Sequence, residues 1–332
     1  MAPPAPLTYI RLQHRLYTVI LRLSFTTEKL TMSRVLLVCL LFTTFAARGE
    51  YHRDYIDQQP LLTTPANNIS IAYRSVGSPE LPTVVMIMGL GASHTVWGDA
   101  MVQGIEAEGY RVILLDNRDT GSSTRFDEWG QPTIWWQLLK QQVGLEVDAP
   151  YTLNDMAADT VALMDELNVS DAHFIGASMG GMIAQVIAAG YPERTRSLIS
   201  IMSTTGAPHL PPPTAEASKA LLGTATNDDS AAERRAAMVA RGFYPEAMGR
   251  QLMAVFKTGD RSTDVSSISS PTLIIHGAED PLLPPPHGAH TAEMIEGSEL
   301  VIYDDMGHNI PDAVLPQLLE KMTQHMQAAD SP

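Results

Sequence analysis

One serine in the chain stands in a setting that suits a nucleophile. Ser178 lies at the centre of GASMG, residues 176–180, which matches the pattern G-x-S-x-G. An apolar run over 172–175 precedes it and a helical pattern over 179–189 follows it, so the sequence predicts a sharp turn between a strand and a helix. Such a turn aims a serine hydroxyl out of the sheet. The alternative is a small residue at a tight turn, because chance supplies this pattern in roughly a tenth of chains of this length.

A serine hydroxyl is a poor nucleophile unless a base takes its proton and a carboxylate orients that base. The chain offers both after Ser178. The apolar runs 272–276 and 299–303 predict two more strands; Asp280 follows the first in GAEDP, and His308 follows the second in DDMGHN. Open α/β sheets place their sites at the carboxyl ends of their strands. We therefore expect the three side chains to converge there and to perform acyl transfer.

Other residues compete for these roles. His276 belongs to the turn before the acid, and the remaining rivals lack the strand-then-glycine setting of His308. These rivals are His94, His173, His209, His287 and His290. Glu279, Asp304 and Asp305 are alternatives to Asp280, but the last two adjoin His308 in sequence and are expected to face solvent. Asp280, which precedes a proline, is the preferred orienting acid.

Acyl transfer also needs hydrogen-bond donors for the oxyanion. One predicted donor is the backbone N–H of Met179, the residue after the nucleophile. The other is the backbone N–H of Leu90, in the loop MGLGAS that follows the apolar run 83–88. The loop DNRDTGSS, residues 116–123, is expected to brace neighbouring loops and is assigned to structure.

Short apolar runs alternate with helical patterns along most of the chain. Seven runs predict strands: 70–73, 83–88, 111–115, 172–176, 197–202, 272–276 and 299–303. Helices are predicted over 153–167, 179–189 and 313–326, the first with Thr152 as its N-cap. Several strands are unbroken apolar runs, which is typical of strands buried on both faces. The fold class is therefore α/β, with a mostly parallel sheet flanked by helices.

The alternation stops between 206 and 270, where short helical patterns follow three prolines and no strand is evident. This stretch is predicted to be a helical cap inserted between two parts of one core, 51–205 and 271–332. Residues 1–50 form a separate basic and apolar segment. The connection 122–150, which contains three tryptophans, is a second long stretch that could overhang a site.

The charge of the chain is uneven. The net charge is -15, yet residues 1–50 hold six basic against two acidic residues, which leaves about -19 on the remainder. Such a surface repels phosphate backbones, so we expect no nucleic-acid partner. Cys39 is the only cysteine, which excludes an intramolecular disulfide and a metal site built from several thiolates.

An apolar run over 35–46, preceded by Arg34 and followed by small residues, is typical of a secretory signal. It predicts export to the periplasm or the medium, with Met32 as the natural start, and it is too short to predict a stable membrane span. The alternative is an N-terminal surface helix on a cytoplasmic protein.

Taken in order, five motifs resemble those of the α/β-hydrolase fold superfamily, over residues 68–328. The motifs are MGLGAS, DNRDTGSS, GASMGG, HGAEDPLLPP and GHNIP. The chain is most similar to single-domain serine esterases, including those described as aclacinomycin methylesterase-like. It departs from the pattern at Met88, where many relatives have His, and at Asp119, where many have Gly. A serine at position 178 sets it apart from relatives with an Asp nucleophile, such as haloalkane dehalogenases and epoxide hydrolases.

The residues and the resemblance together imply a serine hydrolase that cleaves small-molecule carboxylic esters through an acyl-enzyme intermediate. Ser178 attacks, His308 takes the proton, Asp280 orients the imidazole, and the N–H groups of Met179 and Leu90 bind the oxyanion. This chemistry requires no metal ion and no organic cofactor. Two alternatives stay open: another acyl or C–C bond hydrolase on the same triad, such as a thioesterase or lactonase, and a ligand-binding module with little turnover.

Overall fold

The computed structural model describes residues 52–221 and 229–331. The signal-like run, Cys39 and the predicted segment 1–50 lie outside these residues. The described chain forms one eight-stranded sheet in the order β1-β2-β4-β3-β5-β6-β7-β8. Strands β1 and β2, and β2 and β4, pair antiparallel, and all other neighbours pair parallel. The strands are β1 (Leu62–Ala66), β2 (Ile69–Val76), β3 (Thr83–Ile87), β4 (Arg111–Leu115), β5 (Ala172–Ala177), β6 (Thr195–Ile201), β7 (Thr272–Gly277) and β8 (Glu299–Tyr303).

All seven predicted strands are present, and the prediction missed β1. This strand lies at the edge of the sheet, is mostly exposed and contains Pro65, so it has no apolar run to reveal it. A tight turn joins it to β2 through Asn67 and Asn68, which both have positive φ angles, 49° and 65°. Asparagine tolerates this conformation, so the asparagine pair was the one available signal of a hairpin.

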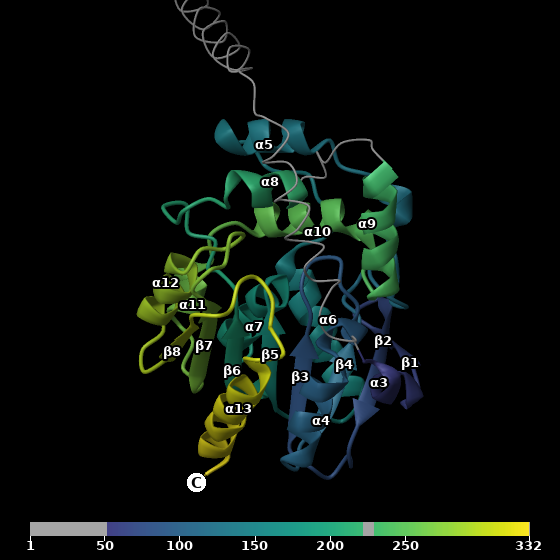
Figure 1. The fold of residues 1–332 in the computed structure, drawn as a ribbon, viewed down its shortest axis with the longest axis vertical. Coiled ribbons are helices and arrows are strands. Elements are labelled where there is room, and N and C mark those ends of the chain that lie inside the picture. The colour runs from purple at the N-terminus through teal and green to yellow at the C-terminus, as the bar shows by residue number, and fades with distance from the viewer. Residues whose placement is uncertain (1–51, 222–228, 332) are drawn as a thin grey trace, which may run out of the picture. The chain divides into compact units, whose positions relative to one another are not determined.

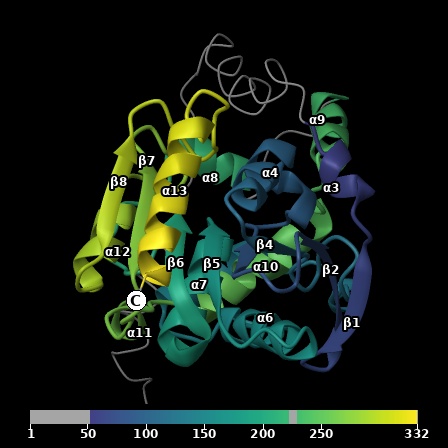
Figure 2. The same cartoon turned by 90° about the horizontal axis from the view of Figure 1, so that it is seen from below.

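Alternate residues of the central strands pack into different layers. In β3, Val84 and Met86 contact one apolar cluster, whereas Val85 and Ile87 contact the other. Helices α4 (Asp99–Ala107) and α13 (Leu315–Asp330) cover the first face. Helices α6 (Leu153–Glu166) and α7 (Met179–Gly190) cover the second, as Figure 2 shows. The prediction of strands buried on both faces is therefore confirmed.

Helix α6 begins as its sequence predicts. The Thr152 side chain accepts the N–H of Asp155, and the Asp155 carboxylate accepts the N–H of Thr152. This reciprocal capping box satisfies donors that a helix cannot satisfy by itself. It fixes the start of a helix that packs directly on α7.

Between β6 and β7 the described chain is helical. The helices are α8 (Ala215–Leu221), α9 (Asp229–Ala240), α10 (Pro245–Thr258) and α11 (Ser262–Val265). Figure 1 places α8, α9 and α10, together with α5 (Ile134–Gln142), at one end of the sheet. We call α8–α10 the cap helices; the exact limits 206–270 stay a prediction.

The remaining helices are α3 (Asp54–Gln58), against α4, and α12 (Pro286–Met294), between β7 and β8. Across residues 52–221 and 229–331, no helix combines the length and the apolar character that crossing a bilayer would need.

Candidate active site

Ser178 lies at the turn between β5 and α7, in a backbone conformation with φ 55° and ψ -119°. The surrounding chain is so crowded that only glycine fits two positions before and two positions after the serine. A Cβ on Gly176 would lie 2.3 Å from the carbonyl oxygen of Gly180, and one on Gly180 would lie 2.0 Å from that of Ile87. The predicted crowding of strand and helix is confirmed. The strained φ of Ser178 is of the kind that persists where the surrounding structure holds a residue in a functional position.

His308 and Asp280 lie beside this serine. The Nε2 atom of His308 is 2.9 Å from Oγ of Ser178, and its Nδ1 atom is 2.7 Å from Oδ2 of Asp280. Because a carboxylate only accepts hydrogen bonds, Nδ1 carries the imidazole proton, and Nε2 is left to accept the serine hydroxyl. The other oxygen of Asp280 accepts the N–H groups of Leu282 and Leu283, both at 2.9 Å. The acid is thus fixed by its own loop while it orients the imidazole.

The topology explains why these residues meet. Strands β7 and β8 are parallel neighbours, so Asp280 and His308 leave the sheet side by side. One strand, β6, lies between β7 and β5, and β5 ends at the serine. Asp280 is 3% exposed, whereas Ser178 and His308 are half-buried. The hydroxyl and the imidazole are therefore open to a small molecule, and the acid is not.

The rival acids lie elsewhere. Glu279, Asp304 and Asp305 are all exposed, as expected for the last two, while the hydrogen bond of His308 goes to Asp280. Among the rival bases, His276 lies closest to the acid, with its Nε2 atom 3.7 Å from Oδ2 of Asp280.

His276 stabilises the loop that contains Asp280, a role that the sequence analysis missed. Its Nε2 atom donates to the carbonyl of Leu283 at 2.7 Å. Burial lowers the pKa of His276, which keeps the ring neutral beside Asp280. Its position at a buried strand end was the only available signal.

The backbone at Met179 and the loop containing Leu90, the two predicted oxyanion donors, both lie beside Ser178. Met179 is the first residue of α7, so its N–H has no acceptor within the helix, and the positive end of the helix dipole lies there. Strand β3 pairs with β5 up to Ile87 and Gly176, which brings the loop containing Leu90 next to Ser178. A Cβ on Gly89 would lie 3.1 Å from the Cβ of Ser178. The roles of Met179 and Leu90 as donors stay predictions.

A buried ion cluster fixes helix α10 over the loop after β4. Arg250, 1% exposed, donates to both oxygens of Asp119 at 2.6 and 2.7 Å and to Asp127 at 2.8 Å. The hydroxyl of Tyr151 also donates to Asp119, at 2.7 Å. Asp119 has φ 74°, a conformation that favours glycine, and its partners hold it there. The structural assignment of residues 116–123 agrees with these contacts, although the partner Arg250 was not foreseen.

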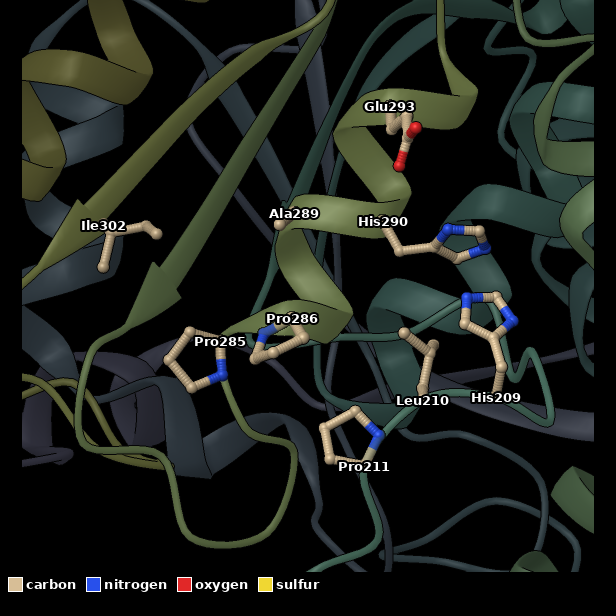
Figure 3. Close-up of a pocket in the computed structure, with 9 residues that line it drawn as sticks. All are labelled: His209, Leu210, Pro211, Pro285, Pro286, Ala289, His290, Glu293 and Ile302. Atoms are coloured by element: carbon tan, nitrogen blue, oxygen red, sulfur yellow. The ribbon is translucent and has the colours of Figure 1, made fainter.

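A hollow of about 510 Å³ lies elsewhere on the surface, and no residue of the Ser178 site lines it. Figure 3 shows its lining. The rings of His209 and His290 are in edge-to-face contact, with their centroids 4.8 Å apart. In the part of the chain that the structure describes, no group of three His, Cys, Asp or Glu side chains could hold a metal ion.

Comparisons with known proteins agree with this architecture. Residues 82–242 match a family model described as the alpha/beta hydrolase fold. The chain is 27% identical over 306 residues to rhodomycin D methylesterase DauP of Streptomyces sp. (strain C5), covering 79% of this chain and 97% of that protein. It is 28% identical over 252 residues to a 2-hydroxy-6-oxononadienedioate/2-hydroxy-6-oxononatrienedioate hydrolase of Cupriavidus pinatubonensis (strain JMP 134 / LMG 1197), covering 68% of this chain and 80% of that one.

Among solved structures, the enol-lactonase from Burkholderia xenovorans LB400 aligns with a TM-score of 0.61 and 20% identity. The alignment covers 80% of this chain and all of that one. At this identity the likeness concerns the fold.

Proposed function

We propose that this chain, which belongs to the α/β-hydrolase fold superfamily, is a serine hydrolase that cleaves carboxylic esters of small molecules. The observation that carries the proposal is the hydrogen-bonded chain from Ser178 through His308 to Asp280, at 2.9 and 2.7 Å. It ends in a half-buried hydroxyl at a helix N-terminus, where negative charge is favoured. The methylesterase relative supports the choice of an ester over other acyl compounds.

In the first half of the reaction, Oγ of Ser178 attacks the ester carbonyl while Nε2 of His308 takes its proton. The carbonyl electron pair moves to oxygen, and the N–H groups of Met179 and Leu90 stabilise that oxyanion. Asp280 holds the imidazole in the required tautomer and stabilises the imidazolium. Collapse of the tetrahedral intermediate re-forms the carbonyl and breaks the bond to the alcohol, which leaves with the proton from His308.

In the second half, water replaces the serine as the nucleophile. His308 takes a proton from water as its oxygen attacks the acyl-enzyme, and then returns a proton to Oγ of Ser178. The carboxylic acid is released and the serine is restored. Each step uses the same proton path, so the residues above account for a full cycle without a cofactor.

A second candidate is another acyl or C–C bond hydrolase on the same residues, since the same groups serve several electrophiles. The relative named as a 2-hydroxy-6-oxononadienedioate/2-hydroxy-6-oxononatrienedioate hydrolase supports this candidate. A panel of methyl esters, thioesters, lactones and vinylogous 1,5-diketones separates the candidates by their kcat/KM values. Higher kcat/KM on a non-ester class than on every ester would overturn the ester assignment.

The direct test is Ser178→Ala in a p-nitrophenyl ester assay. Removing a nucleophile of this kind costs up to about 10⁶-fold in kcat. The variant should unfold with the same cooperativity as the wild type, because the change removes one half-buried hydroxyl. Activity retained in Ser178→Ala would end the assignment.

A further inference from the structure

The loop after β3, residues 88–93, is held by cap helix α10 as well as by the core. Gly91 donates its N–H to Oε1 of Gln251 at 2.6 Å, and its carbonyl accepts the N–H of Tyr244 at 2.7 Å. Tyr244 is the N-cap of α10, and Gln251 lies within that helix. A third bond runs from the N–H of Ser93 to the carbonyl of Gly242 at 2.9 Å. Both polar backbone groups of Gly91 are therefore bound by the cap.

Gln251 is fully buried, and its amide is satisfied at both ends. While Oε1 accepts from Gly91, Nε2 donates to the carbonyl of Arg118 at 3.1 Å. Exchanging the two ends would set donor against donor and acceptor against acceptor, so the orientation of the amide is fixed. Arg118 is itself anchored, since its guanidinium donates to both oxygens of Asp159 in α6 at 2.6 Å each. Gln251 thus ties the loop to a rigid part of the core.

The hydrogen bond donated by Gly91 comes from the central peptide of a tight turn. The N–H of Ala92 donates to the carbonyl of Gly89 at 3.2 Å, which closes a turn with Leu90 and Gly91 at its centre. Gly91 has φ 68°, and a Cβ there would lie 2.5 Å from Cγ of Met248, so glycine is required. The positive φ is what a type II turn needs at this position. The Gly91 N–H belongs to the central peptide, whose rotation interconverts turn types.

We infer that Gln251 is a positioning residue for ester hydrolysis: by holding the central Leu90–Gly91 peptide it fixes the turn, and with it the adjoining Gly89–Leu90 peptide, whose N–H is the predicted donor to the oxyanion that forms beside Ser178. The inference rests on the proposed function. Gln251 acts through the loop and does not touch the reacting atoms. The negative charge develops only as Ser178 attacks, so the loss of Gln251 should lower kcat and leave KM nearly unchanged.

The test measures kcat and KM of Gln251→Met with a p-nitrophenyl ester. Methionine has a similar length and volume but can make neither hydrogen bond. Because a displacement of about 1 Å can cost about 10²-fold in rate, kcat should fall by about that factor. KM should stay within about threefold of the wild-type value. A kcat within about threefold of wild type, or a loss carried entirely by KM, overturns the inference.

Thr258→Val is the matched control. Thr258 lies at the other end of α10, where its Oγ1 accepts the N–H of Leu153 at 3.0 Å. This variant also removes one hydrogen bond between α10 and the core, but it leaves the loop after β3 untouched. It should keep the wild-type kcat. An equal loss of kcat in Thr258→Val and Gln251→Met would mean that general loosening of α10 causes the effect, and would overturn the inference.

Gln251→Glu tests rescue. Its carboxyl can accept from Gly91 and, when protonated, donate to the carbonyl of Arg118, so it should recover most of the kcat lost in Gln251→Met. Equal losses in both variants contradict positioning through the hydrogen bonds. If Gln251→Met does not unfold cooperatively, Gln251→Asn replaces it, because its amide is one methylene too short to reach both partners.

The two proposals fail in different ways. If the proposed function is wrong, the wild type and Thr258→Val hydrolyse no ester, or Ser178→Ala keeps its activity. If only the inference on Gln251 is wrong, the wild type is active, Ser178→Ala is inactive, and Gln251→Met is as active as Thr258→Val.

Discussion

Two sets of serine, histidine and aspartate side chains form hydrogen-bonded chains on the sheet, one near each end of its parallel strands. The proposed catalytic chain lies at the carboxyl ends. The other joins Ser197 in β6, His173 in β5 and Asp330, the last residue of α13. His173 is 2.8 Å from Oγ of Ser197 through Nδ1 and 3.1 Å from Oδ1 of Asp330 through Nε2. Residue types and distances are nearly the same in the two chains.

In the Ser197–His173–Asp330 chain, the two imidazole nitrogens exchange the partners that they have in the Ser178 site. Its carboxylate faces Nε2, so Nε2 carries the proton and Nδ1 accepts the hydroxyl of Ser197. Tyr110 packs its ring edge against His173 at a centroid distance of 5.4 Å and donates its hydroxyl to Asp330 at 3.1 Å. His173 and Ser197 are both 0% exposed. No ester can reach this hydroxyl.

The backbone makes the larger difference. Ser197 lies inside a central strand, where the sheet uses the neighbouring N–H groups. Ser178 lies between a strand and a helix, where the N–H of Met179, the first helical residue, has no acceptor within the helix. A serine, a histidine and an aspartate in contact therefore form a nucleophilic site only when the hydroxyl is accessible and donors for an oxyanion lie beside it.

The largest expected contrast comes from removing the charge of each acid. Asp280→Asn should lower kcat by about 10⁴-fold, because an amide favours the wrong imidazole tautomer. Asp330→Asn, the matched change in the buried chain, should keep kcat near the wild-type value. Ester hydrolysis by the two variants measures this contrast. A similar loss of kcat in both would remove the distinction between the two chains.

The loss of folding stability in acid should depend on His173, in the buried Ser197–His173–Asp330 chain. Burial lowers the pKa of His173 from 6.5 to about 4, and it outweighs the opposing attraction of Asp330. Between these values the unfolded chain binds a proton that the folded chain does not, so stability falls as the pH falls from about 6.5 to 4. The pKa difference corresponds to about 3 kcal/mol.

Urea unfolding of His173→Gln at pH 7 and at pH 4.5 measures this effect. Glutamine does not titrate, so the variant should lose less stability between the two pH values than the wild type does. If both proteins lose the same amount, protonation of His173 does not contribute to the acid sensitivity.

The smallest expected effect is that of Ser197→Ala. The change leaves the buried Nδ1 of His173 without its donor, which should cost about 1–2 kcal/mol of unfolding free energy. Ester turnover should be unchanged. Thermal unfolding and the p-nitrophenyl ester assay on one sample test both halves, and a large drop in turnover would show that the buried serine takes part in the chemistry.

The sequence was informative where a local pattern marked a residue. Ser178, Asp280 and His308 each follow an apolar strand at a turn rich in glycine, so the three could be proposed before the fold was known, as could the cap of α6 at Thr152. Gln251 and Arg250 carry no such mark. Their partners Gly91 and Asp119 lie 160 and 131 residues away in the sequence. A helical pattern does not predict contacts between residues so far apart. His173 was set aside for lack of a glycine turn, yet its contact with Asp330 was equally invisible because it spans 157 residues.

Accessibility and backbone setting should make Ser178, and not Ser197, the nucleophile. A fluorophosphonate probe reacts covalently with activated serines, and peptide mapping by mass spectrometry then locates the label. We predict a single label on the peptide containing Ser178, with much slower labelling in Asp280→Asn and no change in Ser197→Ala. A folded protein that takes up no label, or one labelled at Ser197, would show that Ser178 is not the activated serine.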